Sequence, residues 1–187
     1  CIDFATLSNG ESIKNPHYLR AKQQELSESQ SKYSKLKLKP KDYKPKLRAK
    51  RKLIKLHTKV KNQRKDFIHK LSRKLVENFS HVCVEKIKVS SLLDDGWKSL
   101  NKSILDSGWV NFRQMLNNKA VEAGCSVLEV NPAYTSQVCS GCGKLVPKTL
   151  SERWHTCPVC CLSVSRDLNA ARNILRIGMD SLAANAA

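Results

Sequence analysis

The most regular hydrophobic pattern in the chain covers residues 46–78, where apolar side chains return after three, four or seven positions. The residues of this stripe are Leu53, Leu56, Val60, Phe67, Leu71 and Leu75. Such spacing places side chains on one face of a helix, so we predict a long amphipathic helix over these residues. A polar helix is expected before it, over residues 18–38, because Pro40 and Pro45 follow and interrupt helical hydrogen bonding.

Short apolar runs flank a second amphipathic segment. Residues 81–86 and 126–130 each predict a strand, and residues 104–123 predict a helix that Gly124 would cap. The side chains expected to face inward from this helix are Leu105, Trp109, Phe112, Leu116 and Ala120. A strand, a helix and a strand in this order predict a βαβ unit with parallel strands.

The two ends of the chain add a hairpin and a helix. The residues around Asn9-Gly10 alternate, and this dipeptide favours a tight turn, so a β-hairpin is expected over residues 1–14. Residues 166–177 predict a final helix with Ala170, Ala171, Ile174 and Leu175 on one side. Together these elements predict an α/β protein.

Positive charge dominates the composition, with 34 Lys and Arg against 16 Asp and Glu and a net charge of +18. From Lys32 to Lys74 there are 19 basic residues and only two acidic ones, Asp42 and Asp66. A solvated helical face would also be polar, but like charges at this density repel one another and favour an anionic partner. We therefore expect nucleic-acid contacts on this helix, and the candidate residues are Lys50, Arg51, Lys55 and Lys59. The sequence contains no run of the roughly 20 apolar residues that a membrane helix requires.

Five of the eight cysteines gather between residues 139 and 161, in two Cys-x-x-Cys turns. Cys139 and Cys142 form the first turn, and Cys157 and Cys160 form the second, with 14 residues between them. Four thiolates at this spacing can surround one zinc ion and leave no open coordination position, which predicts a structural zinc ribbon. Two disulfides are the alternative, and His155 and Cys161 are possible substitute ligands. The scattered Cys1, Cys83 and Cys125 are expected to be buried thiols.

Several segments carry a family resemblance when they are taken in order. They are FATLSNGE (4–11), QRKDFIHKLSRKLVEN (63–78), HVCVEKIKV (81–89), SGWVNFRQMLNNKA (107–120) and the stretch from TSQVCSGCG to RDLNAARNIL (135–175). Together they resemble the transposon-encoded OrfB/TnpB proteins, which are relatives of compact RNA-guided nucleases. The resemblance covers nearly the whole chain.

The resemblance implies a RuvC-like nuclease domain of RNase H-like fold. The expected layout is a partial RuvC-like domain over 1–138 with a basic helical insertion over 18–78, a zinc ribbon over 139–162, and a last helix and tail over 163–187. It also implies magnesium-dependent DNA cleavage directed by a guide RNA. Glu85 matches the family's second catalytic carboxylate and Asp167 the third. Carboxylate oxygens suit magnesium, although Glu85 could instead simply follow a strand and Asp167 simply begin a helix.

Some residues depart from the family pattern. The first catalytic aspartate of the family lies upstream of the FATLS segment in a glycine-containing motif that this sequence lacks, and Asp3 better matches a noncatalytic position. Cys161 stands where the family usually has glycine, and Val164-Ser165 replace a usual His-Asp pair. We therefore expect a truncated, nucleoid-associated cytoplasmic copy with weak or no cleavage. The alternatives are an active magnesium-dependent DNA nuclease, a nuclease-dead DNA or RNA binder, and a plain zinc-binding interaction module. The expected partners are DNA and guide RNA, without a membrane.

Overall fold

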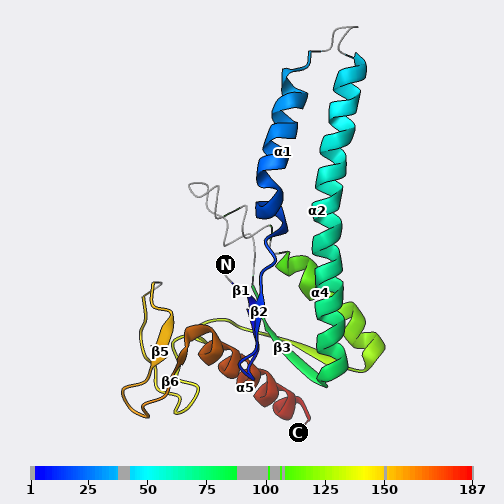
Figure 1. Ribbon diagram of the computed structural model, residues 1–187. Coiled ribbons are helices and arrows are strands. Elements are labelled where there is room, and N and C mark those ends of the chain that lie inside the picture. The colour runs from blue at the N-terminus through cyan, green and yellow to red at the C-terminus, as the bar shows by residue number, and fades with distance from the viewer. Residues whose placement is uncertain are drawn as a thin grey trace.

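The computed structural model describes residues 3–37, 43–87, 101, 106, 108–149 and 151–186. Its elements follow the order β1 (Asp3–Thr6), β2 (Ser12–Lys14), α1 (Tyr18–Lys35), α2 (Tyr43–Asn78), β3 (His81–Glu85), α4 (Trp109–Ala123), β4 (Ser126–Val130), β5 (Trp154–Thr156), β6 (Ser163–Ser165) and α5 (Arg166–Ala186). Figure 1 shows two long helices standing above a group of short strands and helices. The α/β class expected from the sequence is confirmed.

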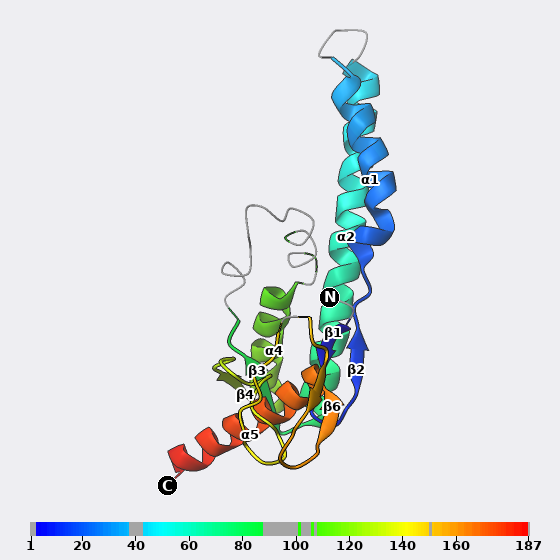
Figure 2. The ribbon, with the colours of Figure 1, turned by 90° about the vertical axis from the view of Figure 1, so that its left-hand side faces the viewer.

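The helices α1 and α2 lie side by side and form an arm that projects from the rest of the molecule (Figures 1 and 2). Leu26 of α1 is buried against Leu56 and Val60 of α2, which belong to the predicted apolar stripe. The long helix begins at Tyr43 and not at residue 46. Pro45 therefore lies in its first turn, where the missing amide hydrogen has no intrahelical acceptor to lose.

The main core lies where the lower half of α2 meets α4 and β1. Phe4 packs edge-on against Phe67, with ring centroids 5.1 Å apart, and against Phe112, at 5.3 Å. Leu116 of α4 has no exposed surface and belongs to the same cluster. The predicted inward positions of α4 are thus confirmed, except that Leu105 lies outside the described residues. Ile68 and Val76 are also buried on α2, so its apolar face is wider than the predicted stripe.

The predicted βαβ unit is present. The strands β3 and β4 are parallel, and their register runs from His81 opposite Ser126 to Glu85 opposite Val130. Gly124 ends α4 in the left-handed conformation, at φ 67°, and its amide donates to the Ala120 carbonyl. Successive side chains of a strand point to opposite faces, so Val82 and Val84 face the α2–α4 core while Cys83 and Glu85 face the other side.

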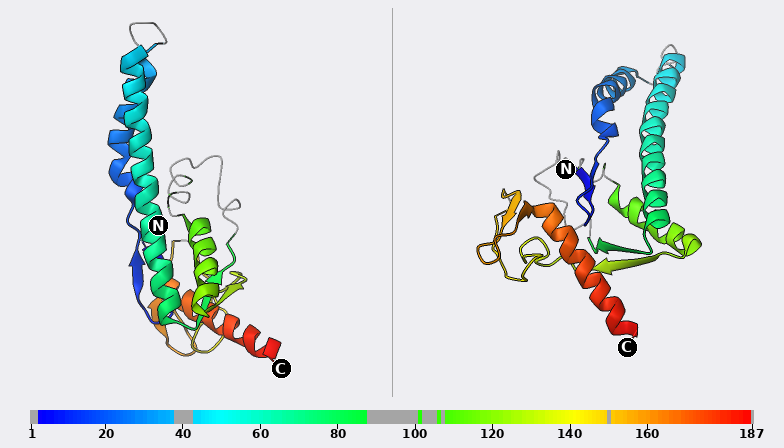
Figure 3. Two further views of the ribbon diagram at one scale, coloured as in Figure 1. Left: turned by 90° about the vertical axis from the view of Figure 1, so that its right-hand side faces the viewer. Right: turned by 60° about the horizontal axis from the view of Figure 1, so that its bottom comes forward.

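The helix α5 covers that other side of β3 and β4, as the right-hand view of Figure 3 shows. Gly178 allows this approach, because a Cβ atom at its position would clash with the Cys83 side chain. The helix extends to Ala186, beyond the predicted end at residue 177. The predicted apolar side of the helix includes Leu175, but this residue is 37% exposed, and Asn169 and Asn173 are buried instead.

The hairpin at the start of the chain is confirmed, with β1 and β2 antiparallel and Gly10 at φ 96° in the turn. None of the helices in the described part of the chain combines the length and the apolar character required to cross a membrane.

Candidate functional site

The four cysteines of the two Cys-x-x-Cys turns converge on one point. Their sulfur atoms all lie within 4.8 Å of one another, and Cys139 Sγ is 3.5 Å from Cys160 Sγ. Cys142 Sγ is 3.6 Å from Cys157 Sγ. A tetrahedral zinc ion with Zn–S bonds of about 2.3 Å separates its sulfur ligands by about 3.8 Å, so the four thiols fit such an ion. The predicted ligands are therefore brought together as a metal-compatible cluster.

The two turns share one backbone pattern. The amide of Cys139 donates to the Lys144 carbonyl, and that of Cys157 donates to the Leu162 carbonyl, both at 2.9 Å. The residue after each second cysteine has a positive φ, 76° at Gly143 and 60° at Cys161. Cys161 thus occupies a position that favours glycine, and its side chain is exposed.

His155, like Cys161, is a possible substitute ligand suggested by the sequence. It lies in β5 with no exposed surface, and neither ring nitrogen has a hydrogen-bond partner among the described residues. Burial, followed by the charge of Lys148, lowers the pKa of its imidazole. Among the described residues the metal-compatible group consists of the four cysteines, with neither His155 nor Cys161 in it.

The pKa values of two of these thiols are consistent with a metal ion shared by the four cysteines. Backbone amides, first that of Cys160, stabilise the Cys157 thiolate and lower its pKa to about 6. The amide of Leu162 also favours the Cys160 thiolate. The hydrogen bonds of the Cys160 thiol with Cys139 and Cys142 outweigh this effect and raise the pKa of Cys160 to about 12. Sulfurs this close cannot all ionise without a cation between them, and a bound metal ion would deprotonate them together.

Glu85 and Asp167, called the acidic pair below, lie on two elements that pack against each other. Glu85 ends β3 and is partly buried, and Asp167 lies in the first turn of α5, which packs on β3. Burial raises the pKa of the Glu85 carboxyl, and the nearby charge of Asp167 raises it further. Ser165 fixes the start of α5, because its hydroxyl accepts a hydrogen bond from the Leu168 amide at 3.2 Å. Two carboxylates held in this way offer oxygen ligands to a divalent cation.

Asp3 is the third carboxylate that the sequence brought into consideration. Its Oδ1 lies 2.8 Å from the Lys14 Nζ on the neighbouring strand, so the structure gives this carboxylate a cationic partner.

The four candidate nucleic-acid contacts all have exposed side chains on α2. Arg51, Lys55 and Lys59 follow one another at intervals of four residues and therefore share one side of the helix. Lys50 precedes Lys59 by nine residues, about two and a half turns, and points the opposite way. Extending the same side toward the helix start adds further cations and defines the cationic face, which consists of Lys44, Arg48, Arg51, Lys55 and Lys59.

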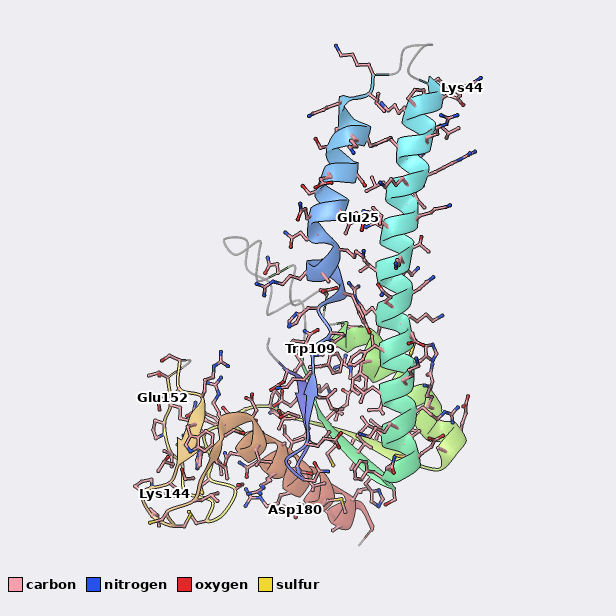
Figure 4. The ribbon with its side chains drawn as sticks, in the orientation of Figure 1. Glu25, Lys44, Trp109, Lys144, Glu152 and Asp180 are labelled. Atoms are coloured by element: carbon pink, nitrogen blue, oxygen red, sulfur yellow. The ribbon has the colours of Figure 1, made fainter. Side chains whose placement is uncertain are left out.

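Acidic partners are distributed unevenly along α2. Within the described residues, the salt bridges of this helix begin at Arg64, which binds Asp106, and continue with Lys70, Arg73 and Lys74. On the arm, Glu25 lies near Lys59: a hydrogen bond from Lys22 is the main cause that lowers the pKa of Glu25, and the charges of Lys52 and Lys59 contribute. Figure 4 shows Glu25 between the two helices and Lys44 at the far end of α2. The excess positive charge of α2 is therefore concentrated on the part of the helix that precedes Arg64 and packs against α1.

Two buried asparagines on α5 were missed by the sequence analysis. Asn169 Nδ2 donates to the Val138 carbonyl at 2.7 Å, and its Oδ1 accepts from the Ser140 amide at 2.9 Å. Asn173 Nδ2 donates to the carbonyls of Thr135 and Val138. Their spacing of four residues, beside the buried Ala170 and Ile174, was the available signal.

A family model described as "Probable transposase", of the OrfB type, matches residues 1–95, and one described as "Cas12f1-like, TNB domain" matches residues 109–174. The chain is 34% identical over 194 residues to the "Putative RNA-guided DNA endonuclease InsQ" of Escherichia coli (strain K12), covering 96% of this chain and 48% of that protein. It is 36% identical to a "Putative RNA-guided DNA endonuclease" of Streptomyces pristinaespiralis, covering 94% and 43%. The chain thus spans just under half the length of these relatives.

Solved structures share the fold. The chain superposes on a CRISPR-Cas12f ternary complex with a TM-score of 0.60 and 20% identity, over 88% of this chain and 34% of that one. A complex of Cas12f1 with single-guide RNA and target DNA gives a TM-score of 0.54 and 18% identity, over 88% and 43%. Since the transposase model matches half of its residues, the chain belongs to the transposon-encoded OrfB/TnpB family.

Proposed function

We propose that this chain is a nucleic-acid-binding protein of the RNA-guided DNA endonuclease class, with DNA and a guide RNA as partners. The observation that supports it best is the electrostatic interaction of Glu85 with Asp167, which lie 82 residues apart in the chain. The relatives named as RNA-guided DNA endonucleases support the same class. The arm adds the cationic face, which supplies charge for a phosphate backbone.

In this proposal the elements β1 to β4, α4 and α5 belong to a RuvC-like core of RNase H-like fold. The arm is an insertion over 18–78, the zinc ribbon covers 139–162, and α5 returns the chain to the core within 163–187. Zinc would be held by Cys139, Cys142, Cys157 and Cys160 and would stabilise the ribbon without taking part in chemistry, because four thiolates leave no open position.

The acidic pair would hold magnesium. When bound there, magnesium supplies Lewis-acid stabilisation to a phosphodiester under attack by water. Glu85 and Asp167 would orient the cation at the carboxyl end of β3. Two carboxylates give a weak site for the two-metal chemistry of phosphodiester hydrolysis, so cleavage by this chain is expected to be slow or undetectable.

The test uses the full chain and measures cation binding and cleavage separately. Binding of Mn²⁺, as a probe for Mg²⁺, is followed by loss of the free-ion EPR signal in the wild type, Glu85→Gln and Asp167→Asn. We expect each substitution to weaken binding, because each removes a charged ligand. Binding that is the same in all three proteins would refute the site.

Nicking of supercoiled DNA with Mg²⁺, and with EDTA as a control, then separates the alternatives. Strong nicking that both variants lose would make the chain an active nuclease. Intact Mn²⁺ and DNA binding without any nicking would make it a nuclease-dead binder, which the pairing of Asp3 with Lys14 favours.

A further inference from the structure

The Asn169 side chain connects two parts of the molecule that have different chemistry. It is fully buried, and its amide uses both ends: the oxygen accepts from the Ser140 amide, and the nitrogen donates to the Val138 carbonyl. Ser140 lies inside the Cys139–Cys142 turn. The hydrogen bond therefore ends directly on the backbone that holds two of the four thiols.

The same asparagine lies close to Asp167 in the chain. Asn169 follows Asp167 by two residues in the first turns of α5, and those turns rest on the cysteine module, which comprises residues 139–162. Figure 4 shows this arrangement, with Lys144 and Glu152 on the module at one end of α5 and Asp180 toward the other. A movement of the Cys139–Cys142 turn would therefore reach the helix start that carries Asp167 through one buried side chain.

We propose that Asn169 is a positioning residue that couples the four-cysteine cluster to the acidic pair. While the thiols are held together by a metal ion, the Ser140 amide lies under the Asn169 oxygen and fixes the start of α5, which keeps Asp167 beside Glu85. This inference rests on the proposed cation site at Glu85 and Asp167. Buried side-chain amides with satisfied partners are well suited to this role, because any alternative position leaves a polar group without a partner.

The chain itself provides a way to break this hydrogen bond without breaking the turn. The second turn has Pro158 at the position that Ser140 occupies in the first, so the turn accepts proline there. Ser140→Pro removes the amide hydrogen that Asn169 accepts and leaves all four cysteines in place. Ser140→Ala is the matched control, since it keeps the amide, and the Ser140 hydroxyl has no partner among the described residues.

The experiment compares the zinc-loaded full chain with Ser140→Pro and Ser140→Ala. Zinc content is measured first, and it is expected to equal that of the wild type in both variants. Mn²⁺ binding is expected to be about three- to tenfold weaker in Ser140→Pro than in Ser140→Ala, the range that one buried hydrogen bond spans. Amide hydrogen exchange of residues 163–170 is expected to accelerate in Ser140→Pro and to remain at the wild-type rate in Ser140→Ala.

Failure of the coupling and failure of the cation site give different results. Equal Mn²⁺ affinity and equal exchange in the two Ser140 variants would overturn the coupling, even if Glu85→Gln abolishes Mn²⁺ binding. If the wild type binds no Mn²⁺, the proposed cation site fails, and the exchange comparison alone still decides whether the turn fixes the helix start. If Ser140→Pro loses zinc, Asn169→Ala in the zinc-loaded chain repeats the comparison from the other side of the hydrogen bond, with Asn173→Ala as its control. Wild-type Mn²⁺ affinity and exchange in Asn169→Ala would also overturn the coupling.

Discussion

The cationic face makes a quantitative prediction about nucleic-acid binding. Lys44 and Lys59 mark its ends and are 15 residues apart, so it is about 22 Å long, which matches about six base pairs of duplex. If each of its five residues contacts one phosphate, the logarithm of the affinity should fall with the logarithm of salt concentration with a slope of about −4.5. Raising the salt from about 50 mM to about 200 mM should then weaken binding roughly 500-fold.

Two double variants with the same change in charge test the position of this face. Arg51→Ala with Lys55→Ala removes two members of the face, and the slope should flatten by about 1.8, leaving a roughly 40-fold loss over the same salt range. Lys50→Ala with Lys61→Ala removes two exposed cations on another side of α2, and the slope should stay near that of the wild type. Fluorescence anisotropy of a labelled duplex at several salt concentrations gives both slopes. An equal change in the two variants would mean that general charge attracts the nucleic acid, and no change in either would move the contact elsewhere.

Three further predictions concern the metal sites and the packing of α5. Cys142→Ser should lower the zinc content and loosen residues 135–165 before the rest of the chain, because a structural site couples metal binding to folding. Metal analysis and hydrogen exchange test this prediction, and an unchanged zinc content would contradict it. Without divalent cations, Glu85→Gln should make the chain more resistant to unfolding by urea. Folding raises the pKa of the Glu85 carboxyl, so the wild type loses stability as the pH rises from the ordinary carboxyl range through that raised pKa. The variant has no carboxyl to ionise at this position and should not share this loss. A stability difference that does not change with pH would argue against a perturbed Glu85. Gly178→Ala should destabilise the chain by roughly 1–3 kcal/mol through overpacking, and Cys83→Ala should recover part of that loss in the double variant, as thermal unfolding would show.

The sequence predicted those elements whose signal is local. The periodicity of α2, the Asn9-Gly10 turn and the strand–helix–strand order each depend on residues near one another in the chain, and the structure confirms them. The short strands β5 and β6 were not predicted, because three residues are too few to show an alternation. The spacing of the cysteines predicted their convergence, since Cys-x-x-Cys turns present both thiols on the same side.

Other features required information that a linear pattern does not contain. The proximity of Glu85 and Asp167 depends on how α5 packs on β3, and only the family resemblance indicated it. Asn169 and Asn173 are polar, so the hydrophobic pattern gave them no inward role, although the carbonyls of Val138 and Thr135 accept hydrogen bonds from them in the interior. Lys50 and Arg51 are adjacent candidates, but neighbours in a helix point about 100° apart, so the two side chains lie on different sides of α2.

The continuity of α2 has a mechanical consequence. One helix without a break belongs both to the arm and to the core, and Ile68, which is buried at the core, lies about 36 Å along the axis from Lys44. A tilt of about 5° at the core would therefore displace the tip of the arm by about 3 Å. In the opposite direction, a force applied to the tip acts on the packing around Phe67 and Leu71 with a long lever arm. The repacking of a few side chains beneath α2 would thus be amplified into a displacement of about 3 Å at the far end.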